Sequence, residues 1–209
     1  STRKESSAAS DVYKRQTLLF PHLLSWVVTS YLVYALLGAT NGFVNNTILA
    51  GMGKEGIDWY SVKMYWPLIL IIVYIWKNAG YTAIVYMAGI AGIDKEIFEA
   101  ARIDGASKIK QIISITLPML RPTVIIMTLM SIGRIFYSDF GLFYQVPMNS
   151  GMLFSVTQTI DTYVYRGLME QGNIGMSSAA GVYQSLVGFI LVMLANYIVR
   201  KKDPENALF

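Results

Sequence analysis

Apolar residues fall into four long blocks along the chain, and the segments between these blocks are polar. The blocks cover residues 20–37, 66–93, 117–137 and 177–199. A transmembrane helix needs about 20 mostly apolar residues, and each block is long enough to supply one. The pattern therefore predicts an all-α integral membrane protein with four transmembrane helices, joined by connections at 39–64, 94–116 and 138–176.

The composition agrees with a membrane location and excludes several other classes of protein. The 209 residues are 54% hydrophobic and 14% charged, with a mean hydropathy of +0.45, whereas a soluble domain has about 25% charged residues. This balance argues against a soluble enzyme, a nucleic-acid-binding protein and a disordered chain. Because the chain has no cysteine and a single histidine, His22, we expect no disulfide, no metal site and no catalytic residue.

The distribution of basic residues predicts the orientation in the membrane. Twelve of the 17 Lys and Arg residues lie before the first apolar block, within 94–121, or after the last block. Positively charged loops stay on the cytoplasmic side, so these three regions are predicted to be cytoplasmic. The connections 39–64 and 138–176 then face outside, and both chain ends lie in the cytoplasm.

The first sixteen residues differ from the rest of the chain. Residues 1–16 are small, polar and charged, and hydrophobicity begins at Thr17. Pro21, His22 and the length of the following apolar block do not fit a secretory signal peptide. Two interpretations remain, a cytoplasmic tail or a segment foreign to the rest of the chain, and we favour the second.

The connection between the second and third blocks is charged and has helical periodicity. Asp94 is placed to cap a helix, and Glu96 lies in its first turn, near the positive end of the helix dipole. Gly105 permits a turn that residues with a Cβ resist. A second short helix can begin at Ser107, and Pro118 marks the entry to the third span. The apolar stripe of this predicted helix–turn–helix consists of Ile97, Phe98, Ala101 and Ile109.

Such a helix–turn–helix at the cytoplasmic face can dock into a groove of a partner protein. The alternative is an amphipathic helix that lies on the membrane surface and merely joins two spans. The spacing favours the first interpretation: Glu-Ala-Ala, three residues, Gly, nine residues, then Ile-x-Leu-Pro. With residue frequencies of about 5–10%, chance agreement at a given start is well below about one in a million. The seven specified positions are Glu99, Ala100, Ala101, Gly105, Ile115, Leu117 and Pro118.

This spacing resembles the motif of binding-protein-dependent ABC importer permeases, and the resemblance extends over residues 17–209. Residues 20–28 look like the start of the third span in carbohydrate-type permeases. Residues 160–166 and 205–209 look like the polysaccharide branch of that group, which is maltose-permease-like. The resemblance implies a type I importer permease bundle of six spans, of which this chain matches the last four. It also implies that 17–209 is a partial permease domain and that 1–16 is non-native or disordered.

The same resemblance implies a mechanism and a set of partners. Residues 94–118 would be the cytoplasmic coupling segment, with 99–105 seated in a cleft of a cytoplasmic ATPase dimer. The stretch 51–55 lacks the spacing and the hydroxyl of a phosphate-binding loop, so no cofactor is expected in this chain, and ATP and Mg²⁺ would bind to the ATPase. Further implied partners are a second, non-identical permease subunit and an extracellular or periplasmic solute-binding protein. The cargo would be an oligosaccharide or related carbohydrate, carried across the bacterial plasma membrane.

Two basic residues, Lys77 and Arg134, lie far from the inner ends of the predicted spans. Lys77 and Arg134 are each 16 residues from the inner end of their span, which places both about 24 Å from the inner edge of a ~30 Å core. Asp139 follows closely as a candidate counter-ion. Ionisable residues in a span mark functional sites by default, so one interpretation is a polar outer vestibule that admits substrate. The other is snorkelling to the outer headgroups, or a structural ion pair.

Sugars are bound by aromatic faces together with amide and hydroxyl groups. Side chains of these types occur in three of the predicted spans, where aromatic residues also serve as interface belts and packing. Together with the charged residues, the candidate substrate pathway comprises Lys77, Asn78, Tyr81, Tyr86, Arg134, Tyr137, Asp139, Tyr183 and Gln184.

Two other classes of membrane protein have to be weighed. A secondary transporter or channel would show inverted repeats and broken helices around a midplane ion site, and the sequence shows no such repeat. A non-transporting scaffold would leave the seven-position cytoplasmic pattern without a reason. ATP hydrolysis stimulated by substrate in the assembled complex separates all three classes.

Overall fold

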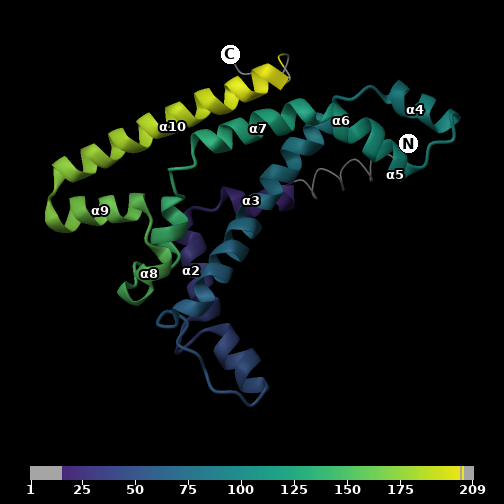
Figure 1. Cartoon of the computed structure of the whole chain (residues 1–209). Helices are drawn as coiled ribbons and strands as arrows, with labels where there is room; N and C mark the ends of the chain where they lie inside the picture. Colours follow the sequence, from purple (N-terminus) through teal and green to yellow (C-terminus); the bar gives the residue numbers. More distant parts are fainter. Residues whose placement is uncertain (1–15, 203, 205–209) are drawn as a thin grey trace. The chain divides into compact units, whose positions relative to one another are not determined.

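The computed structural model describes residues 16–202 and 204, and every regular element within these residues is helical (Figure 1). The all-α class predicted from the sequence is confirmed. The predictions for residues 1–15 and for the tail 205–209 lie outside the described residues.

Two helices are long and apolar enough to cross a membrane as they stand. They are α3 (Trp66–Ala91), preceded by the 3₁₀ turn Lys63–Tyr65, and α10 (Ile174–Lys202). These helices match the second and fourth predicted spans. Their ends differ from the predicted ends by a few residues.

The other two predicted spans are bent pairs of helices. Gln16–Leu23 and α2 (Trp26–Leu37) are bent by 95°, and Lys108–Met119 and α7 (Arg121–Gly133) by 53°. Each pair is apolar and long enough only when its two helices are taken together. The described chain therefore has two candidate spans, or four if each bent pair crosses the membrane as one.

The prediction of one continuous helix over 20–37 is wrong. The first helix ends at Leu23, and Ser25 caps the next, with its Oγ accepting a hydrogen bond from the Val28 backbone N–H at 3.2 Å. A serine that bonds to the backbone in this way competes with continuation of the helix. Hydropathy alone does not register this break.

The third span also differs from its prediction. Its first helix begins at Lys108, so Pro118 lies inside the helix and does not mark its start. This helix consists of α5 (Lys108–Gln111), a π-helical stretch (Ile112–Thr116) and α6 (Leu117–Met119). The bend follows at Leu120, where Pro122 lacks an N–H and its ring crowds the carbonyl one turn back.

The predicted polar connections contain short helices of their own. The connection after α3 contains α4 (Lys95–Ile103). The connection after α2 contains a π-helical segment, Val44–Leu49. The long connection before α10 contains a π-helical segment (Gly141–Gln145), a 3₁₀ turn (Gly151–Leu153), α8 (Phe154–Thr157) and α9 (Ile160–Gln171).

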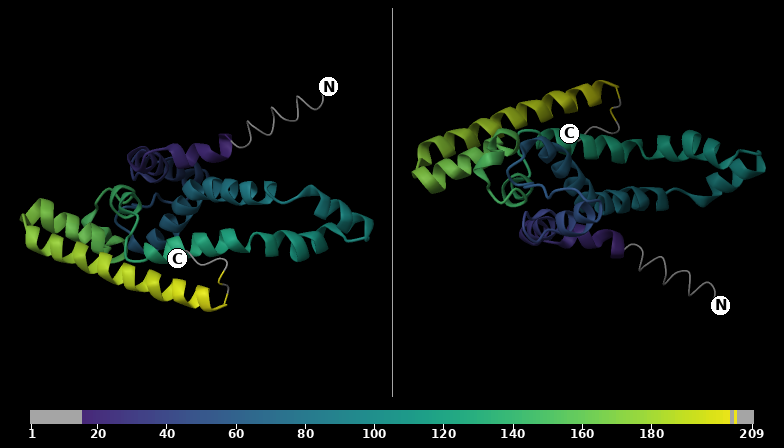
Figure 2. Two further views of the ribbon diagram at one scale, coloured as in Figure 1. Left: turned by 90° about the horizontal axis from the view of Figure 1, so that it is seen from above. Right: turned by 90° about the horizontal axis from the view of Figure 1, so that it is seen from below.

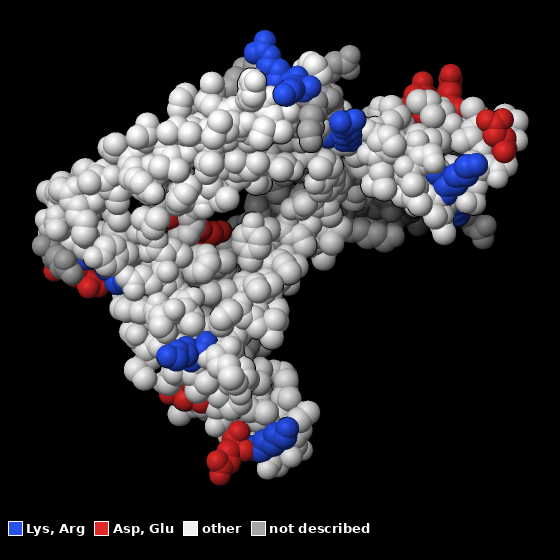
Figure 3. Space-filling model, viewed as in Figure 1, with Lys and Arg blue, Asp and Glu red and all other residues white. Residues whose placement is uncertain are grey.

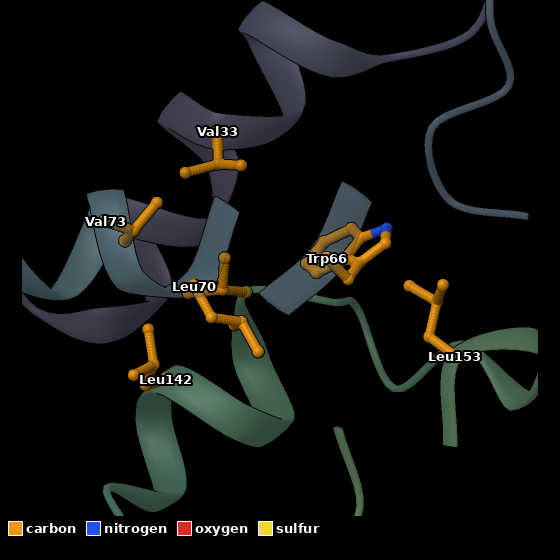
Figure 4. Packing of buried hydrophobic residues seen from close by; sticks show 7 residues of the cluster. Val33, Trp66, Leu70, Val73, Leu142 and Leu153 are labelled. Atoms are coloured by element: carbon orange, nitrogen blue, oxygen red, sulfur yellow. The ribbon is translucent and has the colours of Figure 1, made fainter. Parts of the chain in front are cut away.

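The chain divides into two compact units. The first comprises Ser1–Gly80 and Tyr137–Val182, and the second comprises Tyr81–Phe136 and Tyr183–Phe209. The apolar core of the first unit gathers around Trp66, whose side chain is fully buried and whose Nε1 donates to the carbonyl of Trp59 at 2.6 Å. The buried members of this core, drawn as sticks in Figure 4, are Val33, Trp66, Leu70, Val73, Leu142, Val146 and Leu153.

In the second unit, glycines allow helices to approach closely. A Cβ on Gly89 of α3 would lie 2.8 Å from Cδ2 of Leu120, and a Cβ on Gly188 of α10 would lie 3.2 Å from the carbonyl oxygen of Gly133 in α7. α4 and α5 follow α3 in the chain and lead through α6 into α7 (Figure 2), so the Gly89–Leu120 contact ties together the two ends of this connection.

Candidate functional site

The connection that carries the seven-position motif begins with a well-capped helix. The Asp94 carboxylate accepts a hydrogen bond from the Glu96 backbone N–H at 3.0 Å, which satisfies one of the free donors at the start of α4. Glu96 lies in the first turn and Arg102 in the last, so both charges complement the helix dipole. The predicted first helix is confirmed.

The turn after α4 depends on Gly105. Its φ is +74°, a left-handed conformation that side chains with a Cβ rarely adopt. The Gly105 N–H bonds to the carbonyl of Arg102 at 3.0 Å, and the Ala106 N–H bonds to the carbonyl of Ala101 at 2.9 Å. This pair of bonds is the Schellman pattern, which closes a helix and reverses the chain.

The second helix of the connection begins as predicted. The Ser107 hydroxyl accepts a hydrogen bond from the Lys110 backbone N–H at 3.3 Å and caps α5. Gln111 then reaches back, and its Nε2 donates to the carbonyl of Ala106 at 2.8 Å. These two side chains thus tie the start of α5 to the loop that precedes it.

The helix–turn–helix is exposed along its length. No residue of α4 is buried, and the apolar side chains of Ile103 and Ile109 are 87% and 70% exposed. Acidic and basic side chains both lie on its surface (Figure 3). Exposed apolar groups rimmed by charge are typical of a docking surface for another protein.

The seven motif residues lie along this segment with different exposures. Glu99, Ala100 and Gly105 are exposed, and Ala101 is half-buried beside the turn. The last three lie on the Lys108–Met119 helix, where Ile115 is half-buried and Leu117 and Pro118 are exposed. The structure therefore brings the motif onto one continuous helix–turn–helix in the second unit.

Among the pathway candidates, Lys77 is the most deeply buried charge, with 5% of its side chain exposed. Its Nζ donates to the carbonyls of Pro21 and His22, both at 3.2 Å, and to the carbonyl of Leu24. The ammonium also lies 4.9 Å from the centre of the Trp26 ring. Lys77 is thus bound to the break in the first helix pair.

The remaining pathway candidates of the first unit are Asn78, Asp139 and Tyr137. The Asn78 side chain is half-buried and donates to the carbonyl of Tyr74 in its own helix at 3.0 Å. Asp139 is half-buried and interacts electrostatically with Lys77, as the sequence predicted for a counter-ion. Tyr137 is 44% exposed.

The candidates of the second unit form one cluster and several separate positions. Gln184 is buried, and its Nε2 donates to the carbonyl of Phe136 at 2.7 Å, while the Tyr183 ring meets the Phe136 ring edge to face at 6.2 Å. Arg134 is exposed at the end of α7. Tyr81 is exposed and Tyr86 half-buried on α3. The pathway assignment of these residues stays a prediction.

Sequence reasoning missed a polar centre in the connection before α3. The Asn45 side chain, 5% exposed, donates to the carbonyls of Ala39 and Ile57 and accepts from the Ile57 N–H and from Trp59 Nε1, at 2.8–3.2 Å. All four hydrogen-bonding positions of the amide are used. Because Asn is common in loops, nothing in its local sequence distinguishes it from its neighbour Asn46.

A second missed group lies on α9. Arg166 is 7% exposed, and its guanidinium donates to Asn149 Oδ1 at 2.9 Å and to Thr162 Oγ1 at 3.3 Å. It also lies 3.9 Å from the centre of the Phe154 ring. Asn149 itself has a φ of +47°, which is in the left-handed region. The hydrogen bond from Arg166 therefore stabilises a turn with an uncommon backbone conformation. Within the described residues there is no group of three or more His, Cys, Asp or Glu placed to bind a metal ion.

Comparisons with known proteins agree with this geometry. The polygalacturonan/rhamnogalacturonan transport system permease protein YteP of Bacillus subtilis (strain 168) is 34% identical over 192 residues, which are 91% of this chain and 59% of that protein. Protein LplB of the same organism is 34% identical over 198 residues, or 93% of this chain and 61% of that protein. The chain therefore spans about three fifths of the length of these curated relatives.

A solved structure has the same fold. It is a crystal structure of a bacterial alginate ABC transporter in complex with alginate pentasaccharide-bound periplasmic protein, and one of its chains matches with a TM-score of 0.84 and 28% identity. The match covers 93% of this chain and 67% of that chain. Residues 17–204 also match the family described as "Binding-protein-dependent transport system inner membrane component". The chain therefore belongs to the family of binding-protein-dependent transport system inner membrane components.

Proposed function

We propose that this chain is part of a permease subunit of an ATP-driven importer that moves oligosaccharides or related carbohydrates across the bacterial plasma membrane. The observation that carries the proposal is the exposed helix–turn–helix of α4 and α5, capped at both helices and closed by Gly105. The backbone of the segment is held by the caps at Asp94 and Ser107 and by the turn at Gly105, yet α4 has no buried residue. Such a surface is built to contact another protein.

The partner at this surface is a cytoplasmic ATPase dimer. Binding of ATP and Mg²⁺ and hydrolysis of ATP take place on that partner, and closure of the dimer moves the docked segment with the helices that flank it. The Gly89–Leu120 contact joins those helices directly beside the segment. A displacement of α4 therefore moves the end of α3 and the start of α7 together.

The cargo and the outer partners rest on the relatives. One relative is named for polygalacturonan and rhamnogalacturonan transport, and the alginate transporter was crystallised with a periplasmic protein bound to an alginate pentasaccharide. By analogy, this permease receives a saccharide from a solute-binding protein outside the cytoplasm and pairs with a second, non-identical permease subunit. The saccharide pathway uses aromatic and amide side chains of the candidate set, such as Tyr81, Tyr183 and Gln184.

Disulfide cross-linking tests the coupling role. The 209 residues contain no cysteine, so Ile103→Cys places a single thiol in this part of the protein, at a side chain that is 87% exposed. The variant permease is assembled with ATPase subunits that carry single cysteines along their surface groove, and cross-links are measured in membranes. We expect a cross-link whose yield changes when ATP is added.

Met52→Cys is the matched control, because Met52 is also an exposed apolar residue, at 65%, and lies in the connection predicted to face outside. It should give no cross-link to the ATPase. If Ile103→Cys gives no cross-link to any groove position in the assembled membrane protein, or if Met52→Cys cross-links equally well, the coupling role is wrong. Transport that proceeds without ATP would point to a secondary carrier.

A further inference from the structure

The break in the first helix pair ends the regular backbone hydrogen bonding of the first helix at Leu23. The last carbonyl groups of a helix lie outside its regular pattern and need other donors, and here the Pro21 carbonyl accepts from the Leu24 N–H at 3.3 Å. Inside a bilayer no water replaces those donors, and each unsatisfied group is costly. Non-helical backbone is tolerated at this depth only where other protein groups satisfy it.

Lys77 supplies further donors at this end of the helix. An ammonium has three N–H groups, and Nζ of Lys77 has three carbonyl acceptors, Pro21, His22 and Leu24, all at the end of the first helix. The positive charge is also favourable there, because the carbonyl end of a helix carries the negative end of its dipole. No N–H of Lys77 is left over for a substrate.

The surroundings fix the lysine in this position. The Trp26 ring, at the start of α2, lies 4.9 Å from Nζ, and Asp139 attracts the ammonium. One turn further along α3, a Cβ on Gly80 would clash with the Leu18 carbonyl. The two backbones therefore approach very closely at that point. Gly80 and Lys77, three residues apart, present the same face of α3 to the first helix.

We propose that Lys77 is a positioning residue whose ammonium acts as a tethered cation, holding the first helix pair in its bent form. In secondary transporters, the carbonyl ends of broken helices bind an exchangeable Na⁺ or H⁺. Here the cation is covalently part of the next span. The bend is therefore permanent and does not depend on an ion from solution.

A distance measurement across the break tests this proposal. Spin labels are placed by Phe20→Cys and Leu36→Cys, whose side chains are 60% and 49% exposed, in the full-length permease in lipid nanodiscs. With 1.5 Å per residue, the two backbone positions are about 18 Å apart at the 95° bend and about 24 Å apart in a straight helix. Lys77→Met, which keeps the length and removes the charge, should shift the distribution by up to about 6 Å or broaden it over that range.

Two variants separate the charge from the volume of the side chain. Lys77→Arg keeps a cation with N–H donors and should keep the short distance. Asn78→Ala, at the next position on α3, removes a side chain that bonds only within its own helix and should change nothing. If Lys77→Met retains the narrow, short distribution, or if Lys77→Arg loses it as Lys77→Met does, the proposal is overturned.

If Lys77→Met does not assemble, chemical rescue of a second variant tests whether a hydrogen-bonded cation holds the bend. Lys77→Ala lacks three methylenes and the amine, which n-propylammonium replaces atom for atom. Added during reconstitution, this amine should restore the short distance, whereas tetramethylammonium, which is charged but has no N–H, should not. Failure of n-propylammonium, or equal rescue by tetramethylammonium, would contradict the hydrogen-bonded cation.

Discussion

Replacing Gly105 by alanine isolates the contribution of a single turn to energy coupling. Gly105 has a φ of +74°, and a Cβ added there would meet no atom within 4 Å. The substitution therefore adds no steric clash, and its cost is that of placing an L-residue in the left-handed region, about 1–2 kcal/mol. That cost lowers the ratio of formed to unformed turns by a factor of about 5–30.

The turn decides where α4 points, because the Ala106 N–H and the Ala101 carbonyl close it. If α4 is the coupling helix, loss of the turn weakens docking to the ATPase without disturbing the membrane helices. We expect Gly105→Ala to lower the initial rate of ATP-driven saccharide uptake in proteoliposomes by up to about that 5–30-fold factor. The amount of permease in the membrane should stay at the wild-type level.

Two controls make the result specific. Gly105→Asn should retain more uptake than Gly105→Ala, because asparagine tolerates the left-handed conformation better. Gly172→Ala carries the same backbone cost at a φ of +63°, also in open space, but at the end of α9. The reasoning fails if Gly105→Ala transports at the wild-type rate, or if Gly172→Ala lowers uptake to the same extent.

Three further substitutions test packing, hydrogen bonding and titration. Gly89→Leu forces side-chain atoms against Leu120 and should lower stability by about 1–3 kcal/mol in thermal unfolding of the purified permease. Asn45→Leu leaves Trp59 Nε1 and backbone groups without partners, at about 1–3 kcal/mol for each buried group. Burial, with a smaller contribution from a neighbouring tyrosine, raises the pKa of Tyr60. The stability that its neutral phenol provides is complete below about pH 10 and is lost as the pH rises above that value, so Tyr60→Phe should flatten the alkaline limb of a stability–pH curve.

The packing and hydrogen-bonding predictions each have a matched comparison. Gly92→Ala places a Cβ no closer than 3.5 Å to another atom and should be tolerated. Asn46→Ala removes a single exposed hydrogen bond to Thr40 and should cost far less than the change at Asn45. An alkaline limb as steep in Tyr60→Phe as in the wild type would contradict the argument for Tyr60. Equal effects within any of these pairs would contradict the corresponding argument.

The parts of the fold that the sequence predicted correctly are those encoded locally. The cap at Asp94, the turn at Gly105 and the second start at Ser107 each depend on residues within a few positions, and all three are present. The long helices α3 and α10 were predicted because continuous apolar runs of that length have one stable form in a bilayer. Capping residues and continuous apolar runs were sufficient to predict these helices and this turn.

The breaks in the first and third spans were not predicted, because an average over an apolar window is insensitive to a single residue. Ser25 and Pro122 change the hydrogen bonding of one turn and leave the hydropathy of the window nearly unchanged. Asn45 was missed for the opposite reason. Two of its partners, Ile57 and Trp59, lie 12 and 14 positions away, and only the folded connection brings them together.

Lys77 shows that a charge inside a span identifies an important position without identifying its role. Its depth in the membrane made it a candidate for contact with substrate, yet its acceptors lie 53 to 56 residues earlier in the chain, a distance that no local pattern reveals. The same contacts bear on the class of transporter. A broken helix whose carbonyl end already binds a lysine has no room there for the exchangeable ion that a secondary carrier uses. Under the proposed function the energy for transport enters elsewhere, and we propose that it enters through the exposed, capped helix–turn–helix around Gly105.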